Sequence, residues 1–347
     1  MKSTYFLVAN SKDGFISLYD GFCRGEGDYL TVIKGGPGTG KSAFMRAIGE
    51  AAEARGMATE YILCSGDPDS LDGVYIPAMR RGWVDGTAPH ITEPRRFGVD
   101  GDYVNLGQFC AAPLPPRAAQ AAAGLYEAYR AEYGRAYAYL AAAEALRRAY
   151  LPQLFQGELL DSLRRRMRNI LKRGRVRGAQ GGGTQRRFLS AISCKGEICL
   201  SGEVEKLCKL IYVLEDSLGG AAAALELARE EGDALRAAML ACPSPIDGTA
   251  LEALIFPEWG IGLVREGFGI SEGRRLHLNA AIEPARLAPY RDALGAGQEE
   301  YARLVSRAVE SLKGAKALHD ALEAQYRPQM DFAALTEFRA EYIRDVF

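Results

Sequence analysis

Apolar and polar positions along this chain follow two patterns, one typical of buried strands and one typical of amphipathic helices. Continuous apolar runs at residues 29–33 and 61–64 predict buried strands, because each is short and is followed by glycine, aspartate or proline. Residues 43–48 have helical spacing and follow the first strand across a glycine-rich turn. The order of strand, turn and helix predicts an α/β unit.

A longer pattern with helical spacing begins near residue 117. Tyrosines and a leucine recur there every three or four residues, which predicts an amphipathic helix over 117–150. Apolar positions between 160 and 170 predict a second helix, and we expect the two to form a hairpin packed against its own sheet or against its twin. The tyrosine stripe either packs in the core or stacks nucleic-acid bases. The two stripes are Tyr126, Tyr129, Tyr133, Tyr137 and Leu140, then Leu160, Leu163, Met167 and Ile170.

The second half of the chain repeats the first. Four pairs of segments match in the same order, at offsets that fall from 182 to 176 residues. Any one match is weak, but four in collinear order predict a tandem duplication. The pairs are 5–9 with 187–191, 30–33 with 211–214, 71–77 with 251–257, and 150–154 with 326–330.

The glycine-rich segment at residues 35–42 has the sequence GGPGTGKS, which matches the phosphate-binding loop G-x-x-x-x-G-K-[ST]. Its glycines permit backbone torsions that let successive N–H groups point at phosphate oxygens. Lys41 is expected to reach the β and γ phosphates of ATP, and Ser42 to ligate Mg²⁺. The residues expected to bind the nucleotide are Gly35, Gly36, Pro37, Gly38, Thr39, Gly40, Lys41, Ser42 and Ala43.

The corresponding loop of the second half has lost this chemistry. The repeat sets Lys41 opposite Ala222, and the neighbouring Ser42 also faces an alanine. Glu215 and Asp216 place carboxylates where an anion would lie, so repulsion replaces attraction. We therefore expect the second half to fold without binding phosphate in the usual way.

The expected fold class is α/β, with two tandem P-loop NTPase-like domains. Each is expected to hold a mainly parallel sheet flanked by helices, followed by an α-helical hairpin extension. The first domain is expected over residues 1–172, with its extension from about 115, and the second over 186–347, with its extension from about 283. Glycine and arginine at 173–185 predict a flexible linker.

Nearly the whole chain resembles an uncharacterised group of bacterial proteins with two tandem P-loop ATPase-like domains. In the first half the resemblance depends on residues 34–42, 67–73 (DPDSLDG), 85–90 (DGTAPH) and 102–107 (DYVNLG). Members of the group commonly have two functional loops, so this chain departs from them in its second loop. The resemblance implies ATP binding and hydrolysis, and it brings no assigned substrate.

Asp85 is the leading candidate for a carboxylate that organises Mg²⁺ beside Ser42. It ends a short apolar strand 44 residues after Lys41, a separation that suits a compact P-loop domain. A solvated turn is the alternative interpretation, because arginines and a glycine precede this strand.

Three further aspartates follow the strand at residues 61–64, at the edge where ligands gather in open α/β sheets. Asp67, Asp69 or Asp72 is a candidate for orienting the attacking water, and turn formation is the alternative for this segment. Thr87 and His90 lie just past Asp85, where a γ-phosphate sensor or a proton-transfer group is expected. A structural role is the alternative for His90.

Composition adds limits to this picture. The 347 residues carry a net charge of −1, and the seven cysteines are scattered, which predicts free thiols. No stretch approaches the roughly 20 apolar residues that span a bilayer, and the first residues lack a signal-peptide layout, so we expect a cytoplasmic protein without a membrane partner. Arg164 to Arg187 holds ten positive charges in 24 residues, which favours a nucleic-acid or acidic protein partner, a solvated linker, or an arginine that reaches a neighbouring active site.

Three functions fit these observations. The first is an ATPase that works in its first half and keeps the second as a structural or regulatory domain. The second is a nucleotide-sensing interaction protein with negligible turnover, and the third is a small-molecule kinase. A homodimer is a further expectation, because a second copy would replace the partner site that the second domain lost.

Overall fold

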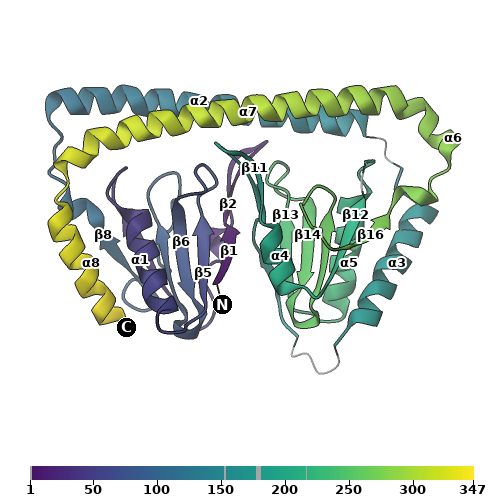
Figure 1. Cartoon of the computed structure of the whole chain (residues 1–347), viewed down its shortest axis with the longest axis horizontal. Helices are drawn as coiled ribbons and strands as arrows, with labels where there is room; N and C mark the ends of the chain where they lie inside the picture. Colours follow the sequence, from purple (N-terminus) through teal and green to yellow (C-terminus); the bar gives the residue numbers. More distant parts are fainter. Residues whose placement is uncertain (1, 152–153, 177–180, 216) are drawn as a thin grey trace.

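A computed structural model describes residues 2–151, 154–176, 181–215 and 217–347 of the protein. Two six-stranded sheets stand side by side below a pair of long helices (Figure 1). The strands of the first sheet are, in spatial order, β1 (Lys2–Phe6), β5 (Thr59–Leu63), β6 (Leu71–Ile76), β7 (Arg81–Asp85), β4 (Tyr29–Lys34) and β8 (Gly101–Asn105).

The second sheet repeats this order with the corresponding strands of the second half. They are β9 (Thr184–Arg186), β13 (Met239–Pro243), β14 (Leu251–Phe256), β15 (Ile261–Arg265), β12 (Leu210–Glu215) and β16 (Arg274–His277). In each sheet the third strand, β6 or β14, is antiparallel to both neighbours, and the other pairings are parallel. The fold is therefore α/β, as expected, and each sheet is mixed, because one antiparallel strand interrupts an otherwise parallel arrangement. The duplication is visible in the strand order.

Two short hairpins join the halves at the centre of the molecule. They are β2 (Val8–Ser11) with β3 (Gly14–Ser17), and β10 (Ser190–Ser193) with β11 (Gly196–Cys199). The backbones of Phe6 and Phe188 exchange two hydrogen bonds of 2.9 Å, and both rings are fully buried. One hydrophobic cluster holds residues from both sheets, among them Leu30, Val84 and Val264. The halves thus share a core.

The helices follow the same repeat. They are α1 (Lys41–Glu53), α2 (Pro116–Tyr150) and α3 (Glu158–Gly174) in the first half, then α4 (Ser201–Leu207), α5 (Gly220–Ala234), α6 (Pro284–Leu287), α7 (Arg291–Tyr326) and α8 (Phe332–Val346). Short 3₁₀ turns are η1 (Tyr19–Gly21), η2 (Pro77–Met79), η3 (Leu106–Phe109), η4 (Pro257–Trp259), η5 (Asn279–Ala281), η6 (Ala288–Tyr290) and η7 (Arg327–Gln329). The two amphipathic helices predicted after residue 117 are confirmed as α2 and α3.

The long helices cross from one half to the other. Helices α2 and α7 lie side by side across the top of both sheets, so each ends over the opposite half (Figure 1). Helix α3 then packs on α5 of the second half through Leu163 and Met167, and α8 packs on α1 of the first half through Leu335. The expected hairpins do not form. Instead, the two long helices α2 and α7 pair with each other. The helix that follows each of them, α3 or α8, then packs on the opposite half.

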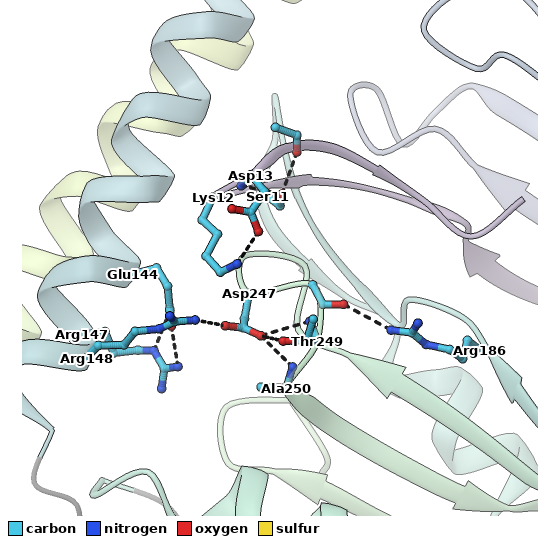
Figure 2. A network of polar contacts seen from close by, with 12 residues as sticks. Ser11, Lys12, Asp13, Glu144, Arg147, Arg148, Arg186, Asp247, Thr249 and Ala250 are labelled. Atoms are coloured by element: carbon cyan, nitrogen blue, oxygen red, sulfur yellow. Dashed lines mark hydrogen bonds and ion pairs between the residues drawn. The ribbon is translucent and has the colours of Figure 1, made fainter.

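A polar network fixes the end of α2 to the second half (Figure 2). Arg148 donates a 2.7 Å hydrogen bond to Asp247, whose carboxylate also accepts one from the backbone N–H of Ala250 at 2.7 Å. On the same helix, the buried carboxylate of Glu144 pairs with Arg147 and Arg148. In the first half Lys316 of α7 lies 3.5 Å from Asp67, the residue that corresponds to Asp247. Each long helix is thus tied to the opposite half at the same turn.

Two remaining expectations concern the linker and the membrane. Helix α3 ends at Gly174 and β9 begins at Thr184, and residues 177–180 of the expected linker lie outside the described part of the chain. Among the described residues, no helix combines the length and the apolar character that a membrane crossing requires.

Candidate functional site

The glycine-rich loop of the first half joins β4 to α1, as its pattern predicts. Helix α1 begins at Lys41, and Gly40 caps it in the left-handed region with a φ of 85°. Gly38 also has a positive φ of 72°. Both positions favour glycine, because a Cβ atom makes this backbone conformation unfavourable. The turn therefore aims the unpaired N–H groups of the start of α1 into the loop.

Lys41 folds back over its own loop. Its Nζ donates hydrogen bonds of 2.8 Å to the carbonyl of Gly35 and 2.9 Å to that of Gly36. The same Nζ lies 3.6 Å from Oδ2 of Asp85, and both side chains are largely buried. The ammonium is therefore held at the loop, where it can exchange carbonyl partners for phosphate oxygens.

Asp85 ends β7, which lies parallel to and beside β4, so the expected second strand is adjacent to the P-loop strand. Oδ1 of Asp85 accepts a 2.8 Å hydrogen bond from the backbone N–H of Thr87. The Thr87 hydroxyl in turn donates a 2.9 Å bond to the carbonyl of Gly35. Asp85 thus closes its own turn with one oxygen and faces Lys41 with the other, in a largely buried turn rather than a solvated one.

Ser42 is the second predicted ligand for Mg²⁺. Its Oγ accepts a 2.9 Å hydrogen bond from the backbone N–H of Leu71, which ties α1 to the start of β6. Among the described residues, no group of three or more His, Cys, Asp and Glu side chains is placed to hold a metal ion by itself. Ser42 and Asp85 nevertheless offer the oxygen ligands that Mg²⁺ prefers, and Mg²⁺ usually completes its shell with waters and substrate phosphates.

Asp72 lies deeper in the same region. It is the second residue of β6, only 4% exposed, and its Oδ2 makes no hydrogen bond. That oxygen lies 3.7 Å from Nε2 of His90, whose Nδ1 also has no hydrogen-bond partner. Burial raises the pKa of Asp72, although His90 and Lys41 lower it and Asp85 raises it further. A buried carboxylate oxygen without a hydrogen bond costs stability, so Oδ2 of Asp72 calls for an explanation.

Aromatic rings fix the orientation of His90. The rings of Phe15 and Tyr19 contact it edge-on, with centroid distances of 5.2 and 5.9 Å. From the sequence, His90 has no predicted partner. The sequence also does not distinguish Asp72 from Asp67 and Asp69 as the candidate for orienting the attacking water. Only the pairing across the fold distinguishes this aspartate, because no local pattern predicts which carboxylate is buried.

The other two candidate aspartates form a turn. Asp67 accepts hydrogen bonds from the N–H of Asp69 and the hydroxyl of Ser70, at 3.3 and 3.4 Å. Asp69 is exposed and pairs with Lys195 of the second half, which lowers its pKa. The structure therefore favours the turn interpretation for both residues, and their carboxylates join the halves.

Residues of the second half contact the glycine-rich loop of the first half. A Cβ atom placed on Gly36 would lie 3.6 Å from the ring of Tyr326, and one placed on Gly40 would lie 3.2 Å from Leu335. The end of α7 and the start of α8 therefore cover this loop. The tyrosine stripe of α2 faces the same region, since the ring of Tyr129 contacts that of His319 of α7 in a tilted arrangement, with a centroid distance of 5.8 Å. This stripe packs between elements, as one of its two interpretations predicts.

The loop of the second half is shorter than its counterpart. Between β12 and α5 it has four residues, 216–219, where the first half has six, 35–40. The helix starts thus set Lys41 opposite Gly220 and Ser42 opposite Ala221. The sequence repeat sets Lys41 and Ser42 opposite Ala222 and Ala223. This pairing is wrong by two residues, because a constant offset does not detect that the second loop is two residues shorter. The loss of both functional groups is the same in either register.

Apolar side chains fill the second loop. The ring of Phe155 contacts Gly220 where a side chain would begin, and Leu154 forms a buried cluster with Leu218 and Ile282. Glu215 pairs with Arg275 at 3.5 Å and with His277, so its charge is compensated rather than left to repel an anion. Asp216 lies outside the described residues. The described part of the second loop is thus lined by apolar side chains, and its carboxylate at Glu215 is paired.

Much of the basic segment is used inside the molecule. Arg164 and Arg168 of α3 pair with Glu230 and Glu231 of α5 at 2.6 and 2.7 Å. Arg165, Arg166 and Arg173 line a cavity of about 660 Å³ together with Arg274. Arg177 lies outside the described residues. Arg187 at the other end of the segment lies 3.9 Å from Glu60 of the first half, so the α3 part of the segment packs on the second half and its end reaches the first.

Comparisons with known proteins add no identification. No protein-family model matches the chain, and no curated protein and no solved structure matches it.

Proposed function

We propose that the first half of this protein binds ATP with Mg²⁺ and hydrolyses it, and that the second half is a structural or regulatory domain that has lost its own site. The observation that carries the proposal is the position of Lys41, held at a glycine loop between the carbonyls of Gly35 and Gly36 and beside Asp85. The resemblance to tandem P-loop ATPase-like proteins supports the same proposal.

The residues of the loop have separate roles in this proposal. The backbone N–H groups at the start of α1 and the ammonium of Lys41 bind the β and γ phosphates. Ser42 and Asp85 would hold Mg²⁺, which neutralises charge on the phosphate oxygens when it is bound. Thr87 keeps the turn after Asp85 against the loop through its bond to Gly35.

We assign orientation of the attacking water to Asp72. It is buried near Lys41 and Asp85, and its Oδ2 has no hydrogen bond to lose. His90 then holds the carboxylate in place through the 3.7 Å contact. Asp67 and Asp69 are less suited to this role, because both already serve the turn and the ion pairs with Lys316 and Lys195.

Lys41→Ala tests the proposal. We expect wild-type protein to bind one MgATP per chain and to release phosphate, and the variant to lose both, because the ammonium that offsets phosphate charge is gone. Calorimetric titration followed by a phosphate-release assay on the same samples checks this. Lys313→Ala is the matched control, since Lys313 is an exposed lysine of α7 that pairs only with Glu310.

The other outcomes separate the competing functions. Tight ATP binding without phosphate release would support a nucleotide sensor, in which the contacts of α7 and α8 with the loop report the nucleotide state to the second half. Phosphate transfer only to an added acceptor would support a kinase. Absence of ATP binding to the wild-type chain would end the proposal, and two sites per chain would show that the second loop is functional.

A further inference from the structure

The C-terminal end of α7 lies against the first P-loop, although it belongs to the second half of the chain. A Cβ atom placed on Gly38 would lie 3.4 Å from Cβ of Glu323 and 3.5 Å from Cγ of Arg327. Arg327 is the first residue of η7, directly after α7. Its side chain therefore starts at the apex of the loop, within reach of whatever the loop binds.

The guanidinium of Arg327 has no partner among the described residues. Its side chain makes no ion pair or hydrogen bond, and the residue is exposed. The nearby carboxylate of Glu323 lies 3.8 Å from Nδ1 of His319 instead. An arginine that is free beside a glycine loop can turn toward an anion without breaking another interaction, and its planar fork suits phosphate oxygens.

The duplication supplies an internal comparison for this position. Residues 326–330 repeat residues 150–154, so Leu151 corresponds to Arg327. Leu151 lies against the second loop, where a Cβ atom placed on Gly219 would be 3.3 Å from its Cδ1. The loop that keeps Lys41 is thus approached by an arginine, and the loop that has Gly220 in its place is approached by a leucine.

We propose that Arg327 contacts the phosphate chain of the nucleotide bound at the first P-loop. The degenerate half would thereby supply a cation to the working site from within the same chain, as an arginine finger in cis. This inference depends on the proposed function. The sequence alone favours a finger from the basic segment 164–187, but Arg164 and Arg168 of that segment are paired with Glu230 and Glu231 of α5.

The experiment compares wild-type protein, Arg327→Ala, Arg327→Lys and the control Arg344→Ala, an exposed arginine of α8 that lies 3.9 Å from Glu341. Affinities for MgATP and for Mg-tripolyphosphate are measured by calorimetry, since tripolyphosphate contains only the phosphate chain. Phosphate release from ATP is then measured with and without added guanidinium. Thermal unfolding of each variant checks that it is folded.

We expect Arg327→Ala to bind both ligands about 10-fold or more weakly, by the same factor, and to release phosphate about 100-fold or more slowly. Arg327→Lys should lose less affinity, free guanidinium should restore part of the Arg327→Ala rate, and Arg344→Ala should match the wild type. A merely structural role would not produce guanidinium rescue or an equal loss for the two ligands.

Two results would overturn the inference. One is wild-type behaviour of Arg327→Ala in both titrations, and the other is a loss of ATP affinity without a loss of tripolyphosphate affinity, which would assign Arg327 to the base or ribose. Failure of the proposed function is a different result. The wild-type chain would then bind neither ligand, and Lys41→Ala would change nothing, or it would bind MgATP without releasing phosphate, and the two titrations alone would then test Arg327.

Discussion

At the scale of single residues, the first half buries an ionisable group, the carboxyl of Asp72, that packing alone does not require. Asp72 is almost fully buried and its Oδ2 has no hydrogen-bond partner, while His90 lies 3.7 Å away. Burial raises the pKa of this carboxyl, so folding disfavours its charged form. A buried carboxyl with a raised pKa, close to a cation such as Lys41, often marks a functional site.

Asp72→Asn is expected to stabilise the protein and to impair phosphate release. A raised carboxyl pKa means that the folded state binds a proton more tightly than the unfolded chain, so wild-type stability falls as the pH rises from the ordinary pKa to the folded one. The variant avoids this loss and should be more stable by about 1 kcal/mol at pH 7.5.

Denaturant unfolding of both proteins between acidic and neutral pH checks this prediction. The two free energies of unfolding should converge near pH 4, at about the ordinary pKa of aspartate. Asp20→Asn, which changes an exposed carboxylate, serves as the control. A destabilised variant with full activity would show that Asp72 is structural.

At the scale of elements, polar contacts at two corresponding turns join the long helices α2 and α7 to the opposite halves. Arg148 holds α2 against Asp247, and Lys316 holds α7 near Asp67 (Figure 2 shows the first of these). Burial raises the pKa of Asp247, but hydrogen bonds from Thr249, Ala250 and Arg148 outweigh it and hold the pKa below its usual range. The charged form of this aspartate therefore stabilises the fold.

Asp247→Asn is expected to destabilise the protein by about 1–3 kcal/mol at neutral pH, because a charge-assisted contact and two turn hydrogen bonds weaken. A lowered carboxyl pKa stabilises the fold above the ordinary pKa, and this stabilisation is lost as the pH falls through the folded value. The difference between variant and wild type should therefore shrink in acid. Denaturant unfolding across this pH range measures the difference. Glu299→Gln, which changes an exposed carboxylate of α7, is the control.

At the scale of the whole molecule, the chain is an intramolecular pseudo-dimer. The two halves share a hydrophobic core, and each covers the other with α3 or α8. The two halves thus pack on each other as the subunits of a dimer do, within one chain. The second half also covers the glycine-rich loop of the first, because Tyr326 of α7, Arg327 of η7 and Leu335 of α8 lie against it.

A fragment of residues 1–176 is expected not to form a folded monomer. Alone, it would expose the face of α2 that contacts α7 and the apolar face of α3, with Leu163 and Met167. We expect it to dimerise by exchanging helices or to stay unfolded, and mixing with residues 181–347 should restore a one-to-one complex. Light scattering and circular dichroism check this, and a stable folded monomer would contradict it.

The sequence alone determined the features that arise from neighbouring residues. The glycine loop with Lys41, the strand that ends at Asp85 and the helices α2 and α3 all follow from local spacing, and the duplication follows from internal similarity. Local patterns succeed here because backbone torsions and the burial of one face of an element depend on residues a few positions apart.

Only the tertiary structure decided which elements meet. It paired Asp72 with His90, filled the second loop with Phe155 and brought Arg327 to the first loop. It also replaced the expected hairpins by helices that cross between halves. The physical reason is that these contacts join residues far apart in the chain, where the choice among several apolar partners is made by the packing of the whole core rather than by spacing.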